Sequence, residues 1–294
     1  MPTITQTSLI PFGQLHDTCY FGCHQVQSEE PWQIPCSVVH VDTNNQYLIL
    51  MSDLIVDFRP FDAKESGGNS DRQSYGNNRW LYSNIRQWLN SSRGPGAWFE
   101  KQHSYDNPPN TSNVGTAGTE YQNRPGFLYY FTTEERALLK ASSIYTETSS
   151  TDGSKIDNDT VSVFLPSTKN LGAGGGASSD FVFQAYSGSS QEERIAHAHR
   201  MACENTGWTG PPDYMSPVQY WTRSPNASNS NNVQSVNTDG SLGDHKAYNG
   251  GNGVRPCFLI TTQGGHVSTL DSLMVLPSAS EISYLSPVRT LTGP

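Results

Sequence analysis

The chain has 294 residues, of which 34% are hydrophobic and 15% are charged, and its formal net charge at pH 7 is −9. This length suffices for one large domain or two small ones with a hydrophobic core, and the 6 Trp, 14 Tyr and 11 Phe argue against a disordered chain. The acidic balance excludes nucleic acid as a partner, since no basic face is available to neutralise phosphates.

The start of the chain and its apolar runs bear on export and membranes. Residues 1–10 lack the basic region and the long apolar region of a secretory signal. No apolar run reaches the ~20 residues that cross a bilayer. We therefore expect a protein that is made in the cytoplasm, does not use the signal-peptide route and does not insert into a membrane. Its odd number of cysteines, 5, does not indicate a disulfide framework.

In the first part of the chain, short apolar runs predict strands. β-Branched residues at 4–10 and 36–41 and the apolar run at 47–51 are typical of strands. Asn44 and Asn45 predict a turn that joins the last two as a hairpin. The polar residues 62–78 predict a surface loop.

Two helices are predicted in the middle of the chain. The first spans residues 78–90, where four apolar residues recur at helical spacing: Leu81, Ile85, Trp88 and Leu89. The second begins at Thr132, because a Thr followed three residues later by Glu135 makes a capping box. Its apolar face contains Leu138 and Leu139.

The later part of the chain returns mostly to strands. A strand is predicted at 161–165, a Gly-rich loop without a phosphate-binding motif at 170–180, and a third helix at 191–205. Further strands are predicted at 219–222, 232–237 and 253–262. Asp239 and Gly240 predict a hairpin turn.

Two groups of Cys and His were candidate zinc ligands by composition. His16, Cys19, Cys23 and His24 have the loose C-x3-C spacing and no second C-x2-C pair, so buried free thiols explain them better. On the predicted helix, His197 and His199 point apart, so these two and Cys203 would not meet at one ion. Asp239 and Asp244 leave calcium open, because several oxygen ligands would have to lie together. We predict no metal site and no cofactor.

Eight segments occur in the order of a known family. They are PWQI at 31–34, YLILMSDLIVD at 47–57, WLYSNIRQWLN at 80–90, FTTEERALL at 131–139, VSVFLPS at 161–167, YWTRSP at 220–225, VNTDGSL at 236–242 and GVRPCFLI at 253–260. This succession, over residues 8–262, resembles a bacterial and phage domain of unknown function that is placed with the C-type-lectin and formylglycine-generating-enzyme fold.

The resemblance implies an α+β domain with a C-type-lectin-like fold: twisted antiparallel sheets, two or three flanking helices and long polar loops. The domain would span residues 1–262, with insertions at 91–126 and 170–218. Residues 263–294 would form a C-terminal extension for docking or oligomer contact. The resemblance also implies an exposed face made by the loops between residues 224 and 252, and a role as an adhesin-like or phage structural protein.

Catalytic motifs are lacking in the sequence. A sulfatase-activating oxidase of this fold would need a Cys pair in its C-terminal part, where only Cys203 and Cys257 occur, and Cys257 lies in an apolar strand. No G-x-S-x-G, H-E-x-x-H or Walker motif is present. We therefore predict a protein that is not an enzyme.

The interval between Ser224 and Asn252 contains seven Asn. Its amide and aromatic side chains suit sugar hydroxyls or a protein epitope, while the alternative is that Asn, Ser and Gly simply form turns. Trp221, Arg223 and Arg255, in the flanking strands, are expected to be structural. The candidate ligand-binding residues are Asn226, Asn229, Asn231, Gln234, His245, Lys246, Tyr248, Asn249 and Asn252.

Together these features predict a non-enzymatic phage virion protein, such as a tail, fibre, baseplate or head-decoration component. It would be assembled in the host cytoplasm, contact other virion subunits as a homo-oligomer, and recognise a glycan or protein on the host surface. The alternatives are a bacterial surface adhesin and, on the same fold, a formylglycine-generating-type oxidase or a hydrolase.

Overall fold

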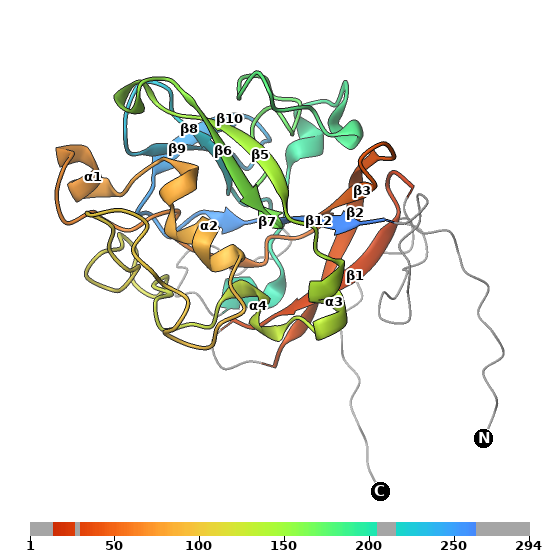
Figure 1. Cartoon of the computed structure of the whole chain (residues 1–294), viewed down its shortest axis with the longest axis horizontal. Helices are drawn as coiled ribbons and strands as arrows, with labels where there is room; N and C mark the ends of the chain where they lie inside the picture. Colours follow the sequence, from red (N-terminus) through yellow and green to blue (C-terminus); the bar gives the residue numbers. More distant parts are fainter. Residues whose placement is uncertain (1–13, 27–29, 205–215, 263–294) are drawn as a thin grey trace, which may run out of the picture.

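The chain forms a mixed α+β fold that consists mostly of β-sheet with short helices, in a computed structural model that describes residues 14–26, 30–204 and 216–262 (Figure 1). Two five-stranded sheets have the orders β1-β2-β3-β12-β7 and β10-β9-β8-β11-β4. A separate antiparallel hairpin pairs β5 (Ser142–Glu147) with β6 (Ile156–Val161). The predicted α+β class is confirmed, and the sheets are antiparallel except for one parallel pair of strands.

The first sheet unites the beginning and the end of the described chain. Its neighbouring strands are all antiparallel. The predicted hairpin between the second and third strands is confirmed, and Asn45 N donates to the Asp42 carboxylate across its turn at 2.9 Å. The predicted strand at 4–10 lies outside the described residues. The strands are β1 (Thr18–His24), β2 (Trp32–Asp42), β3 (Tyr47–Ser52), β12 (Cys257–Thr261) and β7 (Val163–Phe164).

The second sheet carries the predicted Asp239-Gly240 hairpin. Gly240 has a φ of 80°, the left-handed conformation that such a turn requires and that glycine adopts without strain. This sheet is antiparallel except where Gly253 pairs with Tyr220 in parallel. Its strands are β10 (Leu242–Lys246), β9 (Asn232–Val236), β8 (Tyr220–Pro225), β11 (Gly253–Val254) and β4 (Asp57–Phe58).

The single strand predicted at 253–262 is in fact two strands, one in each sheet. The chain leaves β11 at Val254 and enters β12 at Cys257. Pro256 has no N–H to donate to a ladder, and Arg255 Nε donates to the backbone oxygen of Ser52 at 2.9 Å. The bend therefore ties the second sheet to the first. The strand predicted at 161–165 is likewise divided, between β6 and β7.

The helices are short, at five or six residues each. The capping box of Thr132 and Glu135 is confirmed. The helix predicted at 78–90 is interrupted by Ser83, which has an extended backbone and whose side chain caps the second half. The α-helices are α1 (Ser70–Tyr75), α2 (Asn84–Leu89), α3 (Thr133–Leu138) and α4 (Arg200–Glu204), and the 3-10 turns are Trp80–Tyr82, Phe127–Tyr130, Ser150–Asp152, Gln184–Tyr186 and Glu192–Arg194.

The third helix predicted at 191–205 is largely wrong. Only α4 and a 3-10 turn are helical, and the segment between them is extended. Ile55 N donates to His197 O, and His199 N donates to Ile55 O, each at 2.9 Å. Ala196 and Ala198 are both buried, which is the two-residue period of a strand. Backbone pairing with Ile55 thus overrides the local helical preference.

The core also draws on the segment 91–126, which was predicted to be an insertion. Trp98 and Tyr121 are both buried, and their rings stack with centroids 5.2 Å apart. Trp221 is confirmed as structural, because it is fully buried and its Nε1 donates to Arg59 O at 2.8 Å. Arg223 is structural too, since its Nη2 lies 2.6 Å from the buried Asp180 carboxylate.

Candidate functional site: a polar pocket beside strand β10

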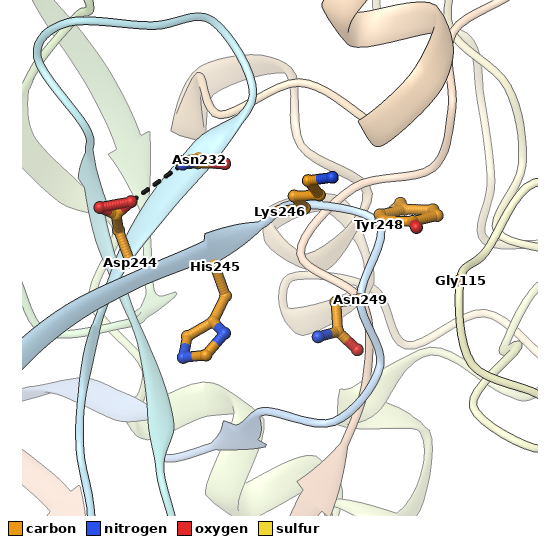
Figure 2. A pocket seen from close by; sticks show the side chains of 7 residues that line it. All are labelled: Gly115, Asn232, Asp244, His245, Lys246, Tyr248 and Asn249. Atoms are coloured by element: carbon orange, nitrogen blue, oxygen red, sulfur yellow. Dashed lines mark hydrogen bonds between the residues drawn. The ribbon is translucent and has the colours of Figure 1, made fainter.

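An open pocket of about 460 Å³ lies beside β10, the edge strand of the second sheet (Figure 2). We call it the β10 pocket. One wall is the β9–β10 hairpin, another is the turn that follows β10, and a third is the loop at Gly115. It is lined by Gly115, Asn232, Asp244, His245, Lys246, Tyr248 and Asn249.

The register of the hairpin explains which side chains meet in the pocket. Asp244 pairs with Gln234, and Lys246 pairs with Asn232. Residues directly opposite in an antiparallel pair share one face of the sheet. His245, one residue between, points to the other face, where its ring lies 6.3 Å from the Trp221 ring. The pocket therefore receives side chains from both faces of this edge.

The Asp244 carboxylate is held by two amides. Asn226 Nδ2 donates to Oδ2 at 3.0 Å, and Asn232 Nδ2 donates to Oδ1 at 2.9 Å, the bond that Figure 2 draws as a dashed line. Asp244 is exposed. Each carboxylate oxygen can accept more than one hydrogen bond, so the group remains an acceptor for a ligand while its position is set.

Asn249 is held at one end only. Its Oδ1 accepts from Thr116 Oγ1 at 3.0 Å and from Gly251 N at 3.1 Å. Its NH2 group has no hydrogen-bond partner in the described part of the chain, and Figure 2 shows Asn249 and His245 extending to the same side of the hairpin. The oriented amide therefore offers two N–H donors to the pocket.

His245 adds a group that can donate and accept. Burial lowers the pKa of His245, although Asp244 raises it in part. The imidazole is therefore neutral at pH 7, with one nitrogen as donor and the other as acceptor.

Lysine and tyrosine side chains form the remaining wall. Lys246 Nζ lies 3.4 Å from the centroid of the Tyr75 ring, and the rings of Tyr75 and Tyr248 are 5.7 Å apart. Gly115 N donates to Tyr248 O at 2.8 Å. A Cβ on Gly115 would lie 2.7 Å from the Tyr248 ring, so only glycine lets this loop approach so closely. These contacts fix the tyrosine without covering the polar groups.

Four of the predicted ligand-binding residues line this pocket: His245, Lys246, Tyr248 and Asn249. Others build the loop that supports it. Asn226 orients Asp244, and Asn229 Oδ1 accepts from the backbone N–H groups of Asn231 and Asn232. Asn226 and Asn229 therefore have the turn-forming role that the sequence left open as the alternative to ligand binding.

Two predicted residues are placed away from the pocket lining. Gln234 is half-buried on β9 opposite Asp244. Asn252 is fully buried, and within the described chain its side-chain amide has no hydrogen-bond partner. A side chain with no exposed surface does not touch a ligand in this conformation.

Three lining residues were not among the predicted ligand-binding residues: Gly115, Asn232 and Asp244. The Asp239-Gly240 turn sets the register of the hairpin. Counting outward from this turn along both strands would have placed Asn232 and Asp244 beside the predicted residues. No local pattern identifies Gly115, which joins the site through a contact distant in sequence.

The candidate metal ligands have other partners. His24 Nε2 lies 2.9 Å from Asp57 Oδ2. Cys19 of β1 lies opposite Cys36 of β2 in the strand register, and both are free thiols. Asp239 Oδ1 accepts from Ser241 N and Oγ. Across residues 14–26, 30–204 and 216–262, no group of three or more His, Cys, Asp or Glu is arranged to hold a metal ion. In the same ranges, none of the helices has the length and apolar character to span a membrane.

Comparison with known families gives a match over most of the chain. The family model described as a domain of unknown function (DUF6273) matches residues 44–262, which is more than half of the chain. No curated protein and no solved structure matches the chain. The chain therefore belongs to the DUF6273 family.

Proposed function

We propose that this member of the DUF6273 family is a non-enzymatic binding protein that recognises a hydroxyl-rich ligand, such as a surface glycan, in the β10 pocket. The observation that supports this most is the fixed orientation of its polar groups. Asp244 is held by two Asn amides and Asn249 by Thr116 and Gly251. Groups that are ordered before the ligand arrives lose less entropy on binding.

The chemistry of the pocket suits sugar hydroxyls. A hydroxyl both donates and accepts; the Asp244 carboxylate accepts, the Asn249 amide donates, and neutral His245 can do either. The volume of about 460 Å³ lies within the range of ~300–1,000 Å³ that is usual for small-ligand sites. Its open form allows a chain of sugar units to continue beyond the residue that is held.

The state of Cys257 favours binding over an oxidase. Cys257 is fully buried, and burial raises the pKa of its thiol to about 12. A thiolate is the reactive form of cysteine, and this thiol stays protonated at physiological pH. The Cys203 side chain lies outside the part of the molecule that the structure describes.

We extend the proposal to a C-type-lectin-like fold and to a place in a phage virion. The fold proposal is supported by two mostly antiparallel sheets, the first of which contains both the first and the last strand of the described chain, with long polar segments between the strands. The virion proposal is supported by the low content of charged residues, 15%, and by the Asn-rich hairpin face. Mass spectrometry of purified phage particles tests it: the protein should be present on particles, and its confinement to infected-cell lysate would contradict the virion role.

Glycan-array binding tests the pocket directly. We expect Asn249→Ala and Asp244→Ala each to weaken binding by about tenfold, because a lost hydrogen bond costs about 0.5–1.5 kcal/mol, or more for a charged group. Tyr248→Ala should weaken binding as well, since the ring orders the wall. The exposed Asn123 provides a control, and Asn123→Ala should bind as wild type. Unchanged binding by both the Asp244 and Asn249 variants would place the site elsewhere.

A further inference from the structure

A second polar cavity lies where β1 of the first sheet meets β4 of the second. Its volume is about 10 Å³, close to the minimum of ~10–15 Å³ for one water-sized particle. It is distinct from the β10 pocket and shares no residue with it. Its lining is His24, Gln25, Asp57, Arg59, Trp88, Arg124, Pro125, Gly126 and Tyr130.

Arg59 has more hydrogen-bond donors than its surroundings use. Its side chain is 2% exposed, and its Nη2 lies 3.0 Å from Asp57 Oδ2. Its Nε and Nη1 are buried and have no hydrogen-bond partner among the described residues. A guanidinium has five N–H donors, and unpaired buried donors are costly. Arg59 thus borders the cavity and has two buried donors that an acceptor placed there could pair.

Both carboxylate oxygens of Asp57 already have hydrogen-bond partners. Oδ2 lies 2.9 Å from His24 Nε2, and Oδ1 accepts from Phe58 N at 2.8 Å. The carboxylate is fully buried. Asp57 therefore serves one side of Arg59 and leaves the side with Nε and Nη1 without an anionic partner.

Arg124 adds a second cation. It is half-buried and borders the same cavity, and its guanidinium group forms no salt bridge or hydrogen bond within the described ranges. Burial lowers the pKa of Arg124 and the charge of Arg59 lowers it further, whereas the charges of Asp57 and Glu120 raise it in part. The lining of the cavity thus holds two guanidinium groups and one buried carboxylate, and the unpaired donors of Arg59 are unfavourable in a poorly hydrated place.

We propose that this cavity binds a small monovalent anion of the halide class, represented by chloride, between the guanidinium groups of Arg59 and Arg124. A water molecule would satisfy the donors but would not offset the second positive charge in the lining. A phosphate or a carboxylate exceeds the volume of the cavity. The bound anion would link β1, β4 and the loop around Arg124, so it would stabilise the junction of the two sheets independently of any ligand in the β10 pocket.

Chloride-dependent unfolding of the full chain tests the site. The protein is dialysed into sodium gluconate, whose anion is too large for the cavity, and sodium chloride replaces it at constant ionic strength. We expect a saturable rise in Tm and broadening of the ³⁵Cl NMR line that bromide reverses. Arg124→Gln should raise the apparent Kd for chloride at least tenfold. Arg93→Gln removes the same charge from an exposed surface pair with Glu100 and should respond as wild type.

A bromide soak of wild-type crystals locates the ion without any variant. An anomalous peak within hydrogen-bond reach of Arg59 and Arg124 is the expected result. A cavity that holds only water, without an anomalous peak, would overturn the proposal. Equal chloride responses of wild type and Arg124→Gln would overturn it too, since the effect would then arise elsewhere. Neither result bears on glycan binding, so the two proposals fail separately.

Discussion

The β10 pocket and the cavity at Arg59 use a carboxylate in opposite ways. In the pocket, exposed Asp244 is held by the neutral amides of Asn226 and Asn232. In the cavity, fully buried Asp57 is paired with Arg59 and His24. An exposed carboxylate is solvated and contributes little to stability, whereas a buried one must be paired. Substitutions in the pocket should therefore affect ligand recognition with little effect on stability, whereas substitutions in the cavity should affect the stability of the fold.

The strongest test of this difference compares the two carboxylates. Asp57→Asn removes the carboxylate that forms the salt bridge with buried Arg59, and we expect the free energy of unfolding to fall by about 3–5 kcal/mol. Asp244→Asn should cost under about 1 kcal/mol, because the residue is exposed. Urea denaturation followed by fluorescence measures both. Equal losses would show that the two sites do not differ in this respect.

Asn78 connects the pocket to the stable interior. It is fully buried, and its Nδ2 donates to the backbone oxygens of Asn229 and Asn232 at 2.8 and 2.9 Å. Asn78→Ala should lower stability by about 1–3 kcal/mol, because buried acceptors lose their donor. It should also weaken glycan binding by loosening the loop that carries Asn226. Exposed Asn123→Ala is the control, and an Asn78 variant with unchanged binding would separate the loop from the site.

Gly115 tests the wall of the pocket. The added methyl of Gly115→Ala would meet the Tyr248 ring at 2.7 Å, and such overpacking typically costs about 1–3 kcal/mol. The Tyr248 ring lines an open pocket and can move into it, so we expect a stability loss at the lower end of that range. We also expect a several-fold loss of glycan affinity. Gly94→Ala is the matched control, since its new methyl would meet its nearest neighbour at 3.7 Å. Retained affinity in Gly115→Ala would show that the tyrosine wall does not contact the ligand.

Buried carboxyls should also differ in their response to pH. Burial raises the pKa of Asp106 to about 6. The pKa of Asp57 is held below its ordinary value, because Arg59 and His24 outweigh the opposing effect of burial. Stability from protonated Asp106 is thus present below its unfolded pKa of about 3.9 and is lost as pH rises through about 6. Stability from ionised Asp57 is present above about 3.9 and is lost as pH falls below it.

Carboxyl ¹³C NMR titration measures both groups in one sample. We expect the Asp106 signal to move near pH 6 and the Asp57 signal to move only in stronger acid. In parallel, urea denaturation of Asp106→Asn should show a smaller loss of stability between about pH 4 and pH 7 than wild type. An Asp106 signal that titrates near about 3.9 would contradict the assignment.

Local patterns predicted the local parts of this molecule. The Thr132 capping box and the hairpin turns at Asn44–Asn45 and Asp239–Gly240 depend on neighbouring residues alone, and all are confirmed. His245, Lys246, Tyr248 and Asn249 were found for the same reason, because one short stretch of chain places them together. The strand β1 was missed since Gly22, at a φ of 74°, interrupts its alternation with a bulge.

The parts that depend on distant contacts could not be read from the sequence. Gly115 reaches the β10 pocket through its bond to Tyr248, and the cavity needs Arg59 and Arg124 from separate segments. The extended segment at Ala196–Ala198 exists because Ile55 pairs with it. In each case the partner lies far along the chain, and no spacing rule connects the two.

The position of β12 has a consequence for biosynthesis. This strand lies inside the first sheet, paired with β3 on one side and β7 on the other, although its residues leave the ribosome some 200 positions after β3, a separation that makes closure of the sheet slow. Until then β3 presents an apolar open edge, which is a template for aggregation. A nascent or truncated chain that ends before residue 257 would need protection by a chaperone, and production of the protein should be most sensitive to interruptions late in translation.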